Sequence, residues 1–335
     1  MLADDLTLAP PRVSVVVAAY NASSFIGAAI ASVQAQTEPS WELLVVDDCS
    51  TDETLEIVAD LASRDARIRT IRTASNSGPG AARNLGFAAA RGEWIAILDA
   101  DDSYAPNRLE TLLRLGELQD GDMVADNILL CDEAKVVPDT PMIPATLLPA
   151  PVRIGAAEFI ARNVGSPELP RVSYGFLKPI LRRSFLLAHA IRYDERNRFA
   201  EDYVLYVRCL LAGAAWWLTP GATYRYTVRK GSLTEEQTSG DLQRIREMEA
   251  GLLRDPAVIA DPALSRAIRR HKTIIDRCYY YRAFTDAVKA RQIKRATELL
   301  FEKPYSTYLI VREGARQMPV VLRKAMRGGY FKRKV

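Results

Sequence analysis

Residues that bind soft metals or form disulfides are scarce in this sequence. Its 335 residues include only two histidines and four cysteines. The cysteines form no CxxC pair and are far apart, at Cys49, Cys131, Cys209 and Cys278. This pattern argues against a zinc site or a disulfide framework and favours a reduced, cytoplasmic setting. A metal site would have to use oxygen ligands, which suit Mg²⁺ or Mn²⁺.

Long hydrophobic runs and nucleotide-loop motifs are also absent. No apolar segment approaches the roughly 20 residues that a spanning helix needs, and Asp4 and Asp5 do not fit a signal peptide. We therefore expect a soluble or peripheral protein. No GxxxxGK[ST] loop occurs, and Gly78 and Gly80 do not follow the first strand as the dinucleotide fingerprint requires. The net charge of +4 gives no support for a nucleic-acid partner.

Strand and helix patterns alternate over the first part of the chain. Four segments predict strands, at 13–17, 42–46, 68–73 and 94–98, and the apolar runs at 13–17 and 94–98 indicate buried ones. A helical pattern follows each of them, beginning near Ser24, Glu53, Gly80 and Pro106. We therefore expect an α/β fold with a Rossmann-like, mostly parallel central sheet flanked by helices. From about residue 241 only helical patterns remain, which predicts a C-terminal helical appendage.

Polar residues follow the end of each predicted strand. They are Tyr20-Asn21, Asp47–Asp52, Gly78–Arg83 and Asp99–Asp102. Acids and serines before a helix are also ordinary caps and turn formers. However, the carboxyl ends of parallel strands share one sheet edge, where ligands bind in open α/β folds. The convergence of carboxylates with a basic residue suited to phosphate favours a site for a nucleotide and a metal ion.

These motifs, in this order and spacing, resemble the family 2 glycosyltransferases, which have the GT-A fold. The matching segments are residues 15–21, 45–52, 78–86 and 95–109. The family's final acidic motif corresponds to Glu201-Asp202, and its Tyr-Arg…basic…Gly-Ser segment to residues 224–232. Together these motifs cover residues 12 to about 235.

Three positions depart from the family's pattern. Ala18-Ala19 stands where relatives often have Pro-Thr, and Cys49 stands where they often have Gly. A histidine that is common near Arg229 is missing here. The last departure removes a metal ligand from that segment but leaves a cation for a diphosphate.

The resemblance implies roles for the residues of the nucleotide half. Asp48 would hydrogen-bond the base, with Tyr20 packed against it and Asn21 beside them. Arg83 would contact base or phosphate, and Asp99 would hold the ribose. The reaction implied is transfer of a sugar from a nucleoside diphosphate donor to an acceptor hydroxyl, with inversion at the anomeric carbon.

The resemblance also implies a metal ion and a catalytic base. Asp101, together with Asp99, would ligate Mg²⁺ or Mn²⁺, and Arg229 would stabilise the departing diphosphate. Asp202, with Glu201 beside it, would accept the proton of the acceptor hydroxyl. The alternative for this pair is structural, because acids in the first turn complement the helix dipole.

The implied organisation has a GT-A domain at 1–235 and a helical region at 236–335. Within the first, 12–118 would bind the nucleotide sugar and 119–235 would hold the acceptor and the catalytic residues. The tail 308–335 mixes apolar residues with many Lys and Arg residues. Such a tail fits an anionic membrane surface or a solvated helix face, and both remain open.

The chain also resembles bacterial exopolysaccharide glycosyltransferases, including the glucosyltransferases of succinoglycan assembly. This resemblance implies UDP-glucose as donor and a lipid-linked oligosaccharide as acceptor, at the inner face of the cell membrane. Two other functions remain. A sugar nucleotidyltransferase would need a glycine- and lysine-rich loop after its first strand, which residues 18–23 lack. A non-catalytic binding protein for nucleotide sugars would not need Asp202.

Overall fold

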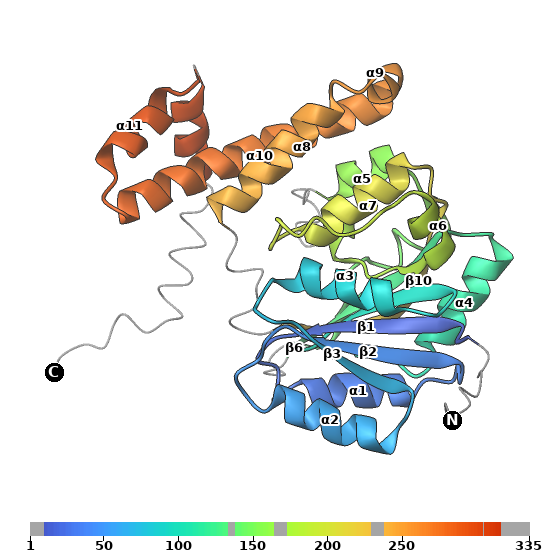
Figure 1. Cartoon of the computed structure of the whole chain (residues 1–335). Helices are drawn as coiled ribbons and strands as arrows, with labels where there is room; N and C mark the ends of the chain where they lie inside the picture. Colours follow the sequence, from blue (N-terminus) through green and yellow to red (C-terminus); the bar gives the residue numbers. More distant parts are fainter. Residues whose placement is uncertain (1–9, 133–137, 164–172, 229–237, 304, 316–335) are drawn as a thin grey trace. The chain divides into compact units, whose positions relative to one another are not determined.

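The computed structural model describes residues 10–132, 138–163, 173–228, 238–303 and 305–315 (Figure 1). The chain divides into two compact units, Met1–Ser232 and Leu233–Val335. The first unit contains the sheet and the second is helical among its described residues. Each unit is described by itself.

The first half of the sheet unit alternates strands and helices, as predicted. Its elements are β1 Val13–Ala19, α1 Ile26–Gln34, β2 Trp41–Asp47, α2 Thr54–Arg64, β3 Ile68–Arg72, α3 Pro79–Ala89 and β4 Trp94–Asp99. Strand β1 pairs in parallel with β2 and β4, and β2 pairs in parallel with β3. Figure 1 shows α3 on one side of these strands and α1 with α2 on the other. Both faces are therefore covered, which explains why β1, β2 and β4 are almost wholly apolar.

The second half extends the sheet with strands of both directions. Its elements are β5 Ser103–Tyr104, α4 Arg108–Leu118, β6 Met123–Asp132, β7 Thr140–Pro141, β8 Val152–Ile154, α5 Ala156–Arg162, η1 Tyr174–Phe176, β9 Ile180–Arg182, α6 Arg183–Ala188, α7 Glu201–Leu211 and β10 Trp216–Val228. The sheet order is β3-β2-β1-β4-β9-β6-β10-β5, with β7 beside β6 and β8 beside β10. Short β9 lies between β4 and β6 and is antiparallel to both. The structure confirms the α/β fold with a mostly parallel central sheet flanked by helices.

The register of the central strands sets one edge for the site. Ala18 in β1 lies opposite Asp99 in β4 and Val46 in β2, and Ala19 lies opposite Asp47. The residues that follow these strands therefore emerge together at their carboxyl ends. Close packing behind this edge depends on Gly86 of α3, because a Cβ there would lie 2.3 Å from Cγ1 of Val16.

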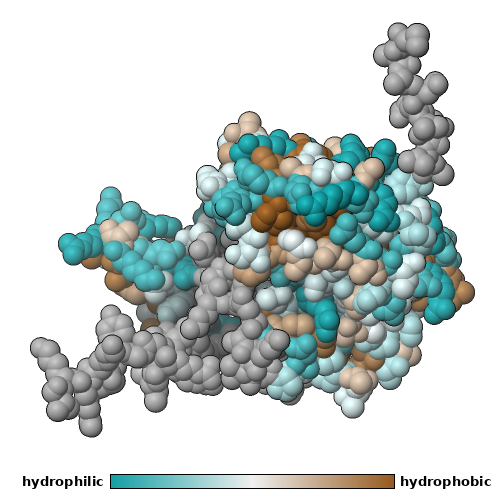
Figure 2. Space-filling view, turned by 90° about the horizontal axis from the view of Figure 1, so that it is seen from below, coloured by the Kyte–Doolittle hydropathy of each residue, from teal (hydrophilic) through white to brown (hydrophobic). Residues whose placement is uncertain are grey.

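The surface of the sheet unit is largely polar around α1 and α2. These helices form the lower edge of the unit in Figure 1, and the view from below in Figure 2 shows hydrophilic residues with smaller hydrophobic areas between them. A shallow groove on these helices is lined by Gly27, Glu53, Glu56, Ile57, Asp60 and Leu61.

The helical unit contains α8 Ser239–Leu252, α9 Pro256–Ala260, α10 Pro262–Lys289, α11 Ile293–Phe301 and a helix over 306–315. Thr238 begins α8 with a capping box to Asp241, and Asp261 caps α10 ahead of Pro262. The helices enclose a small core, formed by Leu242, Tyr279, Tyr280, Ala283, Ala287, Ala296, Leu299, Leu309 and Ile310. Across the described part of the chain, every helix is too short or too polar to cross a membrane.

Candidate active site

The centre of the candidate site is the carboxylate of Asp99 at the end of β4. Its Oδ1 lies 2.7 Å from Nη2 of Arg83, and its Oδ2 lies 2.9 Å from Nζ of Lys178. Arg83 comes from the first turns of α3, and Lys178 from the segment just before β9. The side chain of Asp99 is 22% exposed, so this carboxylate is still open to solvent at the sheet edge.

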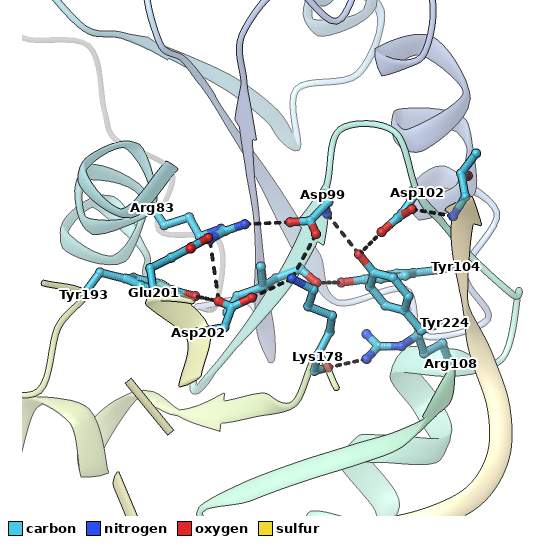
Figure 3. A network of polar contacts seen from close by, with 12 residues as sticks. Arg83, Asp99, Asp102, Tyr104, Arg108, Lys178, Tyr193, Glu201, Asp202 and Tyr224 are labelled. Atoms are coloured by element: carbon cyan, nitrogen blue, oxygen red, sulfur yellow. Dashed lines mark hydrogen bonds and ion pairs between the residues drawn. The ribbon is translucent and has the colours of Figure 1, made fainter. Parts of the chain in front are cut away.

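The acids of α7 meet the same two cations (Figure 3). Oδ2 of Asp202 lies 2.6 Å from Nζ of Lys178, and Oδ1 accepts a hydrogen bond of 2.8 Å from the hydroxyl of Tyr193. Arg83 Nη1 donates to Oε1 of Glu201 at 2.7 Å and lies 3.5 Å from Oδ1 of Asp202. The structure therefore brings the predicted residues Arg83, Asp99, Glu201 and Asp202 into one network.

The electrostatics of this network follow from burial and close opposite charges. Burial by itself would lower the pKa of Lys178, but the carboxylates of Asp202 and Asp99 raise it well above its ordinary value. Burial would raise the pKa of Asp99, but Lys178 and Arg83 hold it well below its usual range. For Glu201, burial outweighs the attraction of Arg83 and raises the carboxyl pKa. Lys178 is thus a permanent ammonium group among carboxylates at neutral pH.

The two other acids of the turn after β4 have different surroundings. Asp102 is buried, and its carboxylate accepts hydrogen bonds from the hydroxyl of Tyr224 at 2.7 Å and from the amide of Thr227 at 2.8 Å. The Tyr224 hydroxyl in turn accepts a bond from the amide of Asp99. Asp102 therefore ties the turn to β10, whereas Asp101 is only half-buried.

Asp48 holds the loop that precedes α3. Its carboxylate accepts hydrogen bonds from the amides of Ser77 and Gly78, at 3.0 and 2.7 Å, and from the hydroxyl of Thr73 at 3.0 Å. The sequence resemblance implies a contact with a nucleotide base for Asp48, and the lone pair capacity that remains on its oxygens is compatible with one. That role stays a prediction.

Tyr20 and Asn21 lie at the end of β1, beside the loop of Asp48. Tyr20 is 51% exposed, so its ring is accessible. The side-chain oxygen of Asn21 accepts a bond of 2.9 Å from the amide of Thr51. Asn21 and Cys49 both have positive φ angles, 49° and 64°. The family's preference for Gly at the position of Cys49 has this physical reason, because the left-handed region favours Gly.

Arg229, the predicted diphosphate contact, lies outside the described residues. Two residues of the network were not predicted, Lys178 and Tyr193. Lys178 had a local signal, because it is the one charge within the apolar run 176–181, and a buried charge needs partners. Tyr193 had none, because a lone tyrosine before a polar stretch is common.

The fit of a divalent metal ion can be judged from the oxygen donors. Within the described ranges, no group of three or more His, Cys, Asp or Glu residues is arranged to hold a metal by itself. Mg²⁺ in phosphate-transfer sites, however, usually takes one or two carboxylates, water and substrate phosphates. The half-buried carboxylate of Asp101 fits such a donor set. Both oxygens of Asp99 contact cations, so a metal ion there would compete with Arg83 and Lys178.

Comparison with known proteins identifies the family. The family model "Glycosyl transferase family 2" matches residues 14–145. The succinoglycan biosynthesis protein ExoU of Rhizobium meliloti (strain 1021) is 35% identical over 86% of this chain and 82% of its own length.

Two solved structures share the fold. S. aureus TarS (residues 1–349) in complex with UDP-GlcNAc has a TM-score of 0.63 at 18% identity, over 86% of this chain and 90% of that one. The mannosyltransferase PcManGT of Pyrobaculum calidifontis, in complex with GDP-Man and Mn²⁺, has a TM-score of 0.56 at 19% identity, over 90% and 83%. With an α/β sheet of the GT-A type and a relative of this identity and coverage, the chain belongs to the family 2 glycosyltransferases.

Proposed function

We propose that this glycosyltransferase transfers glucose from UDP-glucose to a hydroxyl group of a lipid-linked oligosaccharide, with inversion, in bacterial exopolysaccharide biosynthesis. The observation that carries the catalytic part is the network in which Asp99, at the end of β4, and Asp202, at the start of α7, share the ammonium of Lys178. The biosynthetic setting is supported by the similarity to the succinoglycan biosynthesis protein ExoU. The UDP donor is supported by the fold shared with TarS in complex with UDP-GlcNAc.

The donor would bind along the carboxyl ends of β1, β2 and β4. Tyr20 offers an exposed ring for the base, and Asp48 positions the loop before α3 and retains acceptor capacity. The carboxylate of Asp99 would accept hydrogen bonds from the ribose hydroxyls. When bound, Mg²⁺ or Mn²⁺ at Asp101 would supply positive charge for the departing diphosphate, with Arg229 as a further cation.

The acceptor would be activated by Asp202. Each of its carboxylate oxygens accepts one bond, from Lys178 or from Tyr193, so each keeps a lone pair for the proton of a hydroxyl group. Inversion requires this base on the side of the sugar ring opposite to the diphosphate. Glu201 would support the base indirectly, because its carboxylate holds Nη1 of Arg83.

Three parts of the chain would have separate roles. Residues 12–118 would bind the nucleotide sugar, 119–235 would hold the acceptor and the base, and 236–335 would be a separate helical region. On that region Phe301, Tyr308 and Val311 are exposed, and so is Arg312, which donates a hydrogen bond to the hydroxyl of Tyr308. This apolar and basic surface would contact anionic lipid at the inner face of the membrane, where the acceptor lies. Most of the basic tail, 316–335, lies outside the described residues.

One assay separates this function from its alternatives. The protein is incubated with Mn²⁺, radiolabelled nucleotide sugars and an undecaprenyl-diphosphate oligosaccharide. Release of UDP with label in the lipid fraction is expected, and NMR of the product should show the anomeric configuration opposite to that of the donor. Consumption of pyrophosphate would instead indicate a nucleotidyltransferase, and binding without turnover would indicate a sugar-nucleotide-binding protein.

A further inference from the structure

Lys178 is a buried cation shared by two acids from distant parts of the chain. Its side chain is 6% exposed, and Nζ lies 2.9 Å from Asp99 Oδ2 and 2.6 Å from Asp202 Oδ2. Burying an ammonium group is costly unless charged partners surround it. Here Nζ of Lys178 lies between its two partners, so one ammonium group bridges the carboxylates of Asp99 and Asp202 (Figure 3).

The backbone of Lys178 is held in place by a buried arginine, Arg108. Its carbonyl oxygen accepts a hydrogen bond of 2.5 Å from Nη2 of Arg108. Arg108 is fully buried, pairs with Asp126 at 2.9 Å and lies 4.3 Å from the ring centre of Tyr104. Lys178 also leads directly into β9, which is held between β4 and β6. The ammonium group is therefore presented from a rigid base.

Among the described residues, Arg83 is the other cation that contacts both acids, and it is less suited to hold them together. Nη2 of Arg83 lies 2.7 Å from Oδ1 of Asp99. Its Nη1 pairs with Glu201 at 2.7 Å and lies farther, 3.5 Å, from Oδ1 of Asp202. Without Lys178, Arg83 would be the one cation among the described residues that pairs with the carboxylates of Asp99, Glu201 and Asp202. Repulsion would then favour a larger separation between Asp99 and Asp202.

We propose that Lys178 is a positioning residue that holds the carboxylate of Asp202 in place for the acceptor while it binds the carboxylate of Asp99 on the donor side. The inference rests on the proposed function, because the Asp202 it positions is the proposed base. Lys178 touches neither the transferred sugar nor the leaving group in this scheme. Lys178 affects turnover indirectly, because it fixes the positions of Asp99 and Asp202.

Chemical rescue of Lys178→Ala tests this role. The substitution removes the equivalent of propylamine, and we expect kcat to fall about 100-fold, as for a reacting group displaced by about 1 Å. The donor KM should rise by a smaller factor. Added n-propylammonium should restore part of kcat with saturation, whereas 1-propanol should not, because the charge and its hydrogen bonds hold the acids.

Two variants serve as controls. Lys178→Met fills the same space without charge, so it should lose as much turnover as Lys178→Ala and should not respond to propylammonium. Lys272→Ala removes an ammonium that pairs with Asp276 at 2.8 Å in the helical unit. It should keep wild-type kcat and show no response to the amine.

Wild-type turnover in Lys178→Ala or Lys178→Met would overturn the proposal, as would equal rescue by the amine and the alcohol. If the wild-type protein transfers no sugar to any acceptor, the proposed function fails separately. Thermal unfolding then still decides the geometry: propylammonium should raise the Tm of Lys178→Ala and leave the wild type and Lys178→Met unchanged. An equal change in Tm on adding propylammonium to all three proteins would contradict the shared ammonium site.

Discussion

The hydroxyl group of Tyr193 donates a hydrogen bond of 2.8 Å to Oδ1 of Asp202, while Oδ2 of the same carboxylate contacts Lys178. Burial and the charge of Asp202 raise the pKa of Tyr193 well above its ordinary value, so the phenol remains a donor. Asp202 is thus oriented from both of its oxygens. This is the arrangement expected of a base that must meet one hydroxyl group in one direction.

Asp202→Asn should abolish most of the turnover without loss of donor binding. We expect kcat to fall roughly 10²–10⁴-fold, the usual contribution of a general base. Calorimetry should show unchanged affinity for the nucleotide sugar and the metal ion. Glu201→Gln is the matched variant, and its loss should be smaller because Glu201 contacts Arg83 and stands beside the base. Undiminished activity in Asp202→Asn would remove this residue from the mechanism.

Asp101→Ala should remove the metal dependence of donor binding. Wild-type protein should bind UDP-glucose more tightly with Mn²⁺ than after chelation with EDTA, because the cation links Asp101 to the diphosphate. In the variant the two affinities should converge, as measured by calorimetry. Asp60→Ala, an exposed acid on α2, should behave like the wild type. Unchanged metal dependence in Asp101→Ala would place the metal ion elsewhere.

Cys49→Gly should stabilise the sheet unit. Cys49 has a φ of 64°, and the left-handed conformation costs about 1–2 kcal/mol for a residue with a Cβ. Gly relieves this strain but loses about 0.5–1 kcal/mol through the entropy of the unfolded chain, so the net gain is up to about 1.5 kcal/mol. Denaturant titration should show a higher midpoint for Cys49→Gly. Cys49→Ala should show no such gain, and a lower midpoint for the glycine variant would argue against strain at this position.

The stability of the helical unit should depend on pH through Asp276. Burial would raise the pKa of this carboxyl, but hydrogen bonds from Lys272 and Arg246 lower it. A carboxyl group with a lowered pKa stabilises the fold above its unfolded value of about 3.9, and this contribution is lost as the pH falls through the folded value.

At pH 7, Asp276→Asn should therefore destabilise the unit by about 1–3 kcal/mol. The difference from the wild type should shrink when the pH is lowered below about 4. Thermal unfolding monitored by circular dichroism at both pH values measures this. Asp286→Asn on the same helix is the control. A difference that persists unchanged at low pH would mean that the ion pairs do not cause it.

Membrane contact should depend on the exposed aromatic residues of the helical unit. Phe301 and Tyr308 are 77% and 59% exposed. Replacing both by Ser should weaken binding to vesicles rich in phosphatidylglycerol by at least about tenfold, because burial of each apolar side chain contributes about 1.5–3 kcal/mol. Leu118→Ser, equally exposed on the sheet unit, is the control. If wild-type protein does not sediment with such vesicles, this surface is a solvated helix face.

The sequence predicted most of the nucleotide half. The strands at 13–17, 42–46 and 94–98 were found because strands buried on both faces are mostly apolar, and this signal is local. The strand at 68–73 was also found, although β3 is mostly exposed. The family match at 14–145 covers the same region. The helical character of the second unit was also predicted, from the helical patterns after about residue 241.

The structure between residues 119 and 235 was harder to predict from the sequence. The three residues of β9 and the two of β5 are too short for a periodic pattern, yet β9 joins the strands β4 and β6. Asp102 appeared in the sequence as one of three equivalent acids, and only its contacts with Tyr224 and Thr227 distinguish it as the one that ties the turn to β10.

The sequence by itself determined which acids and which bases stand at the ends of the strands, because strand ends and turns are recognised from neighbouring residues. Only the tertiary structure decided which of them pair. Arg83 and Glu201 are separated by 118 residues, and Lys178 and Asp202 by 24. These side chains come from α3, β4, α7 and the segment before β9. Their charge balance depends on how these elements pack, and a local sequence pattern does not predict that packing.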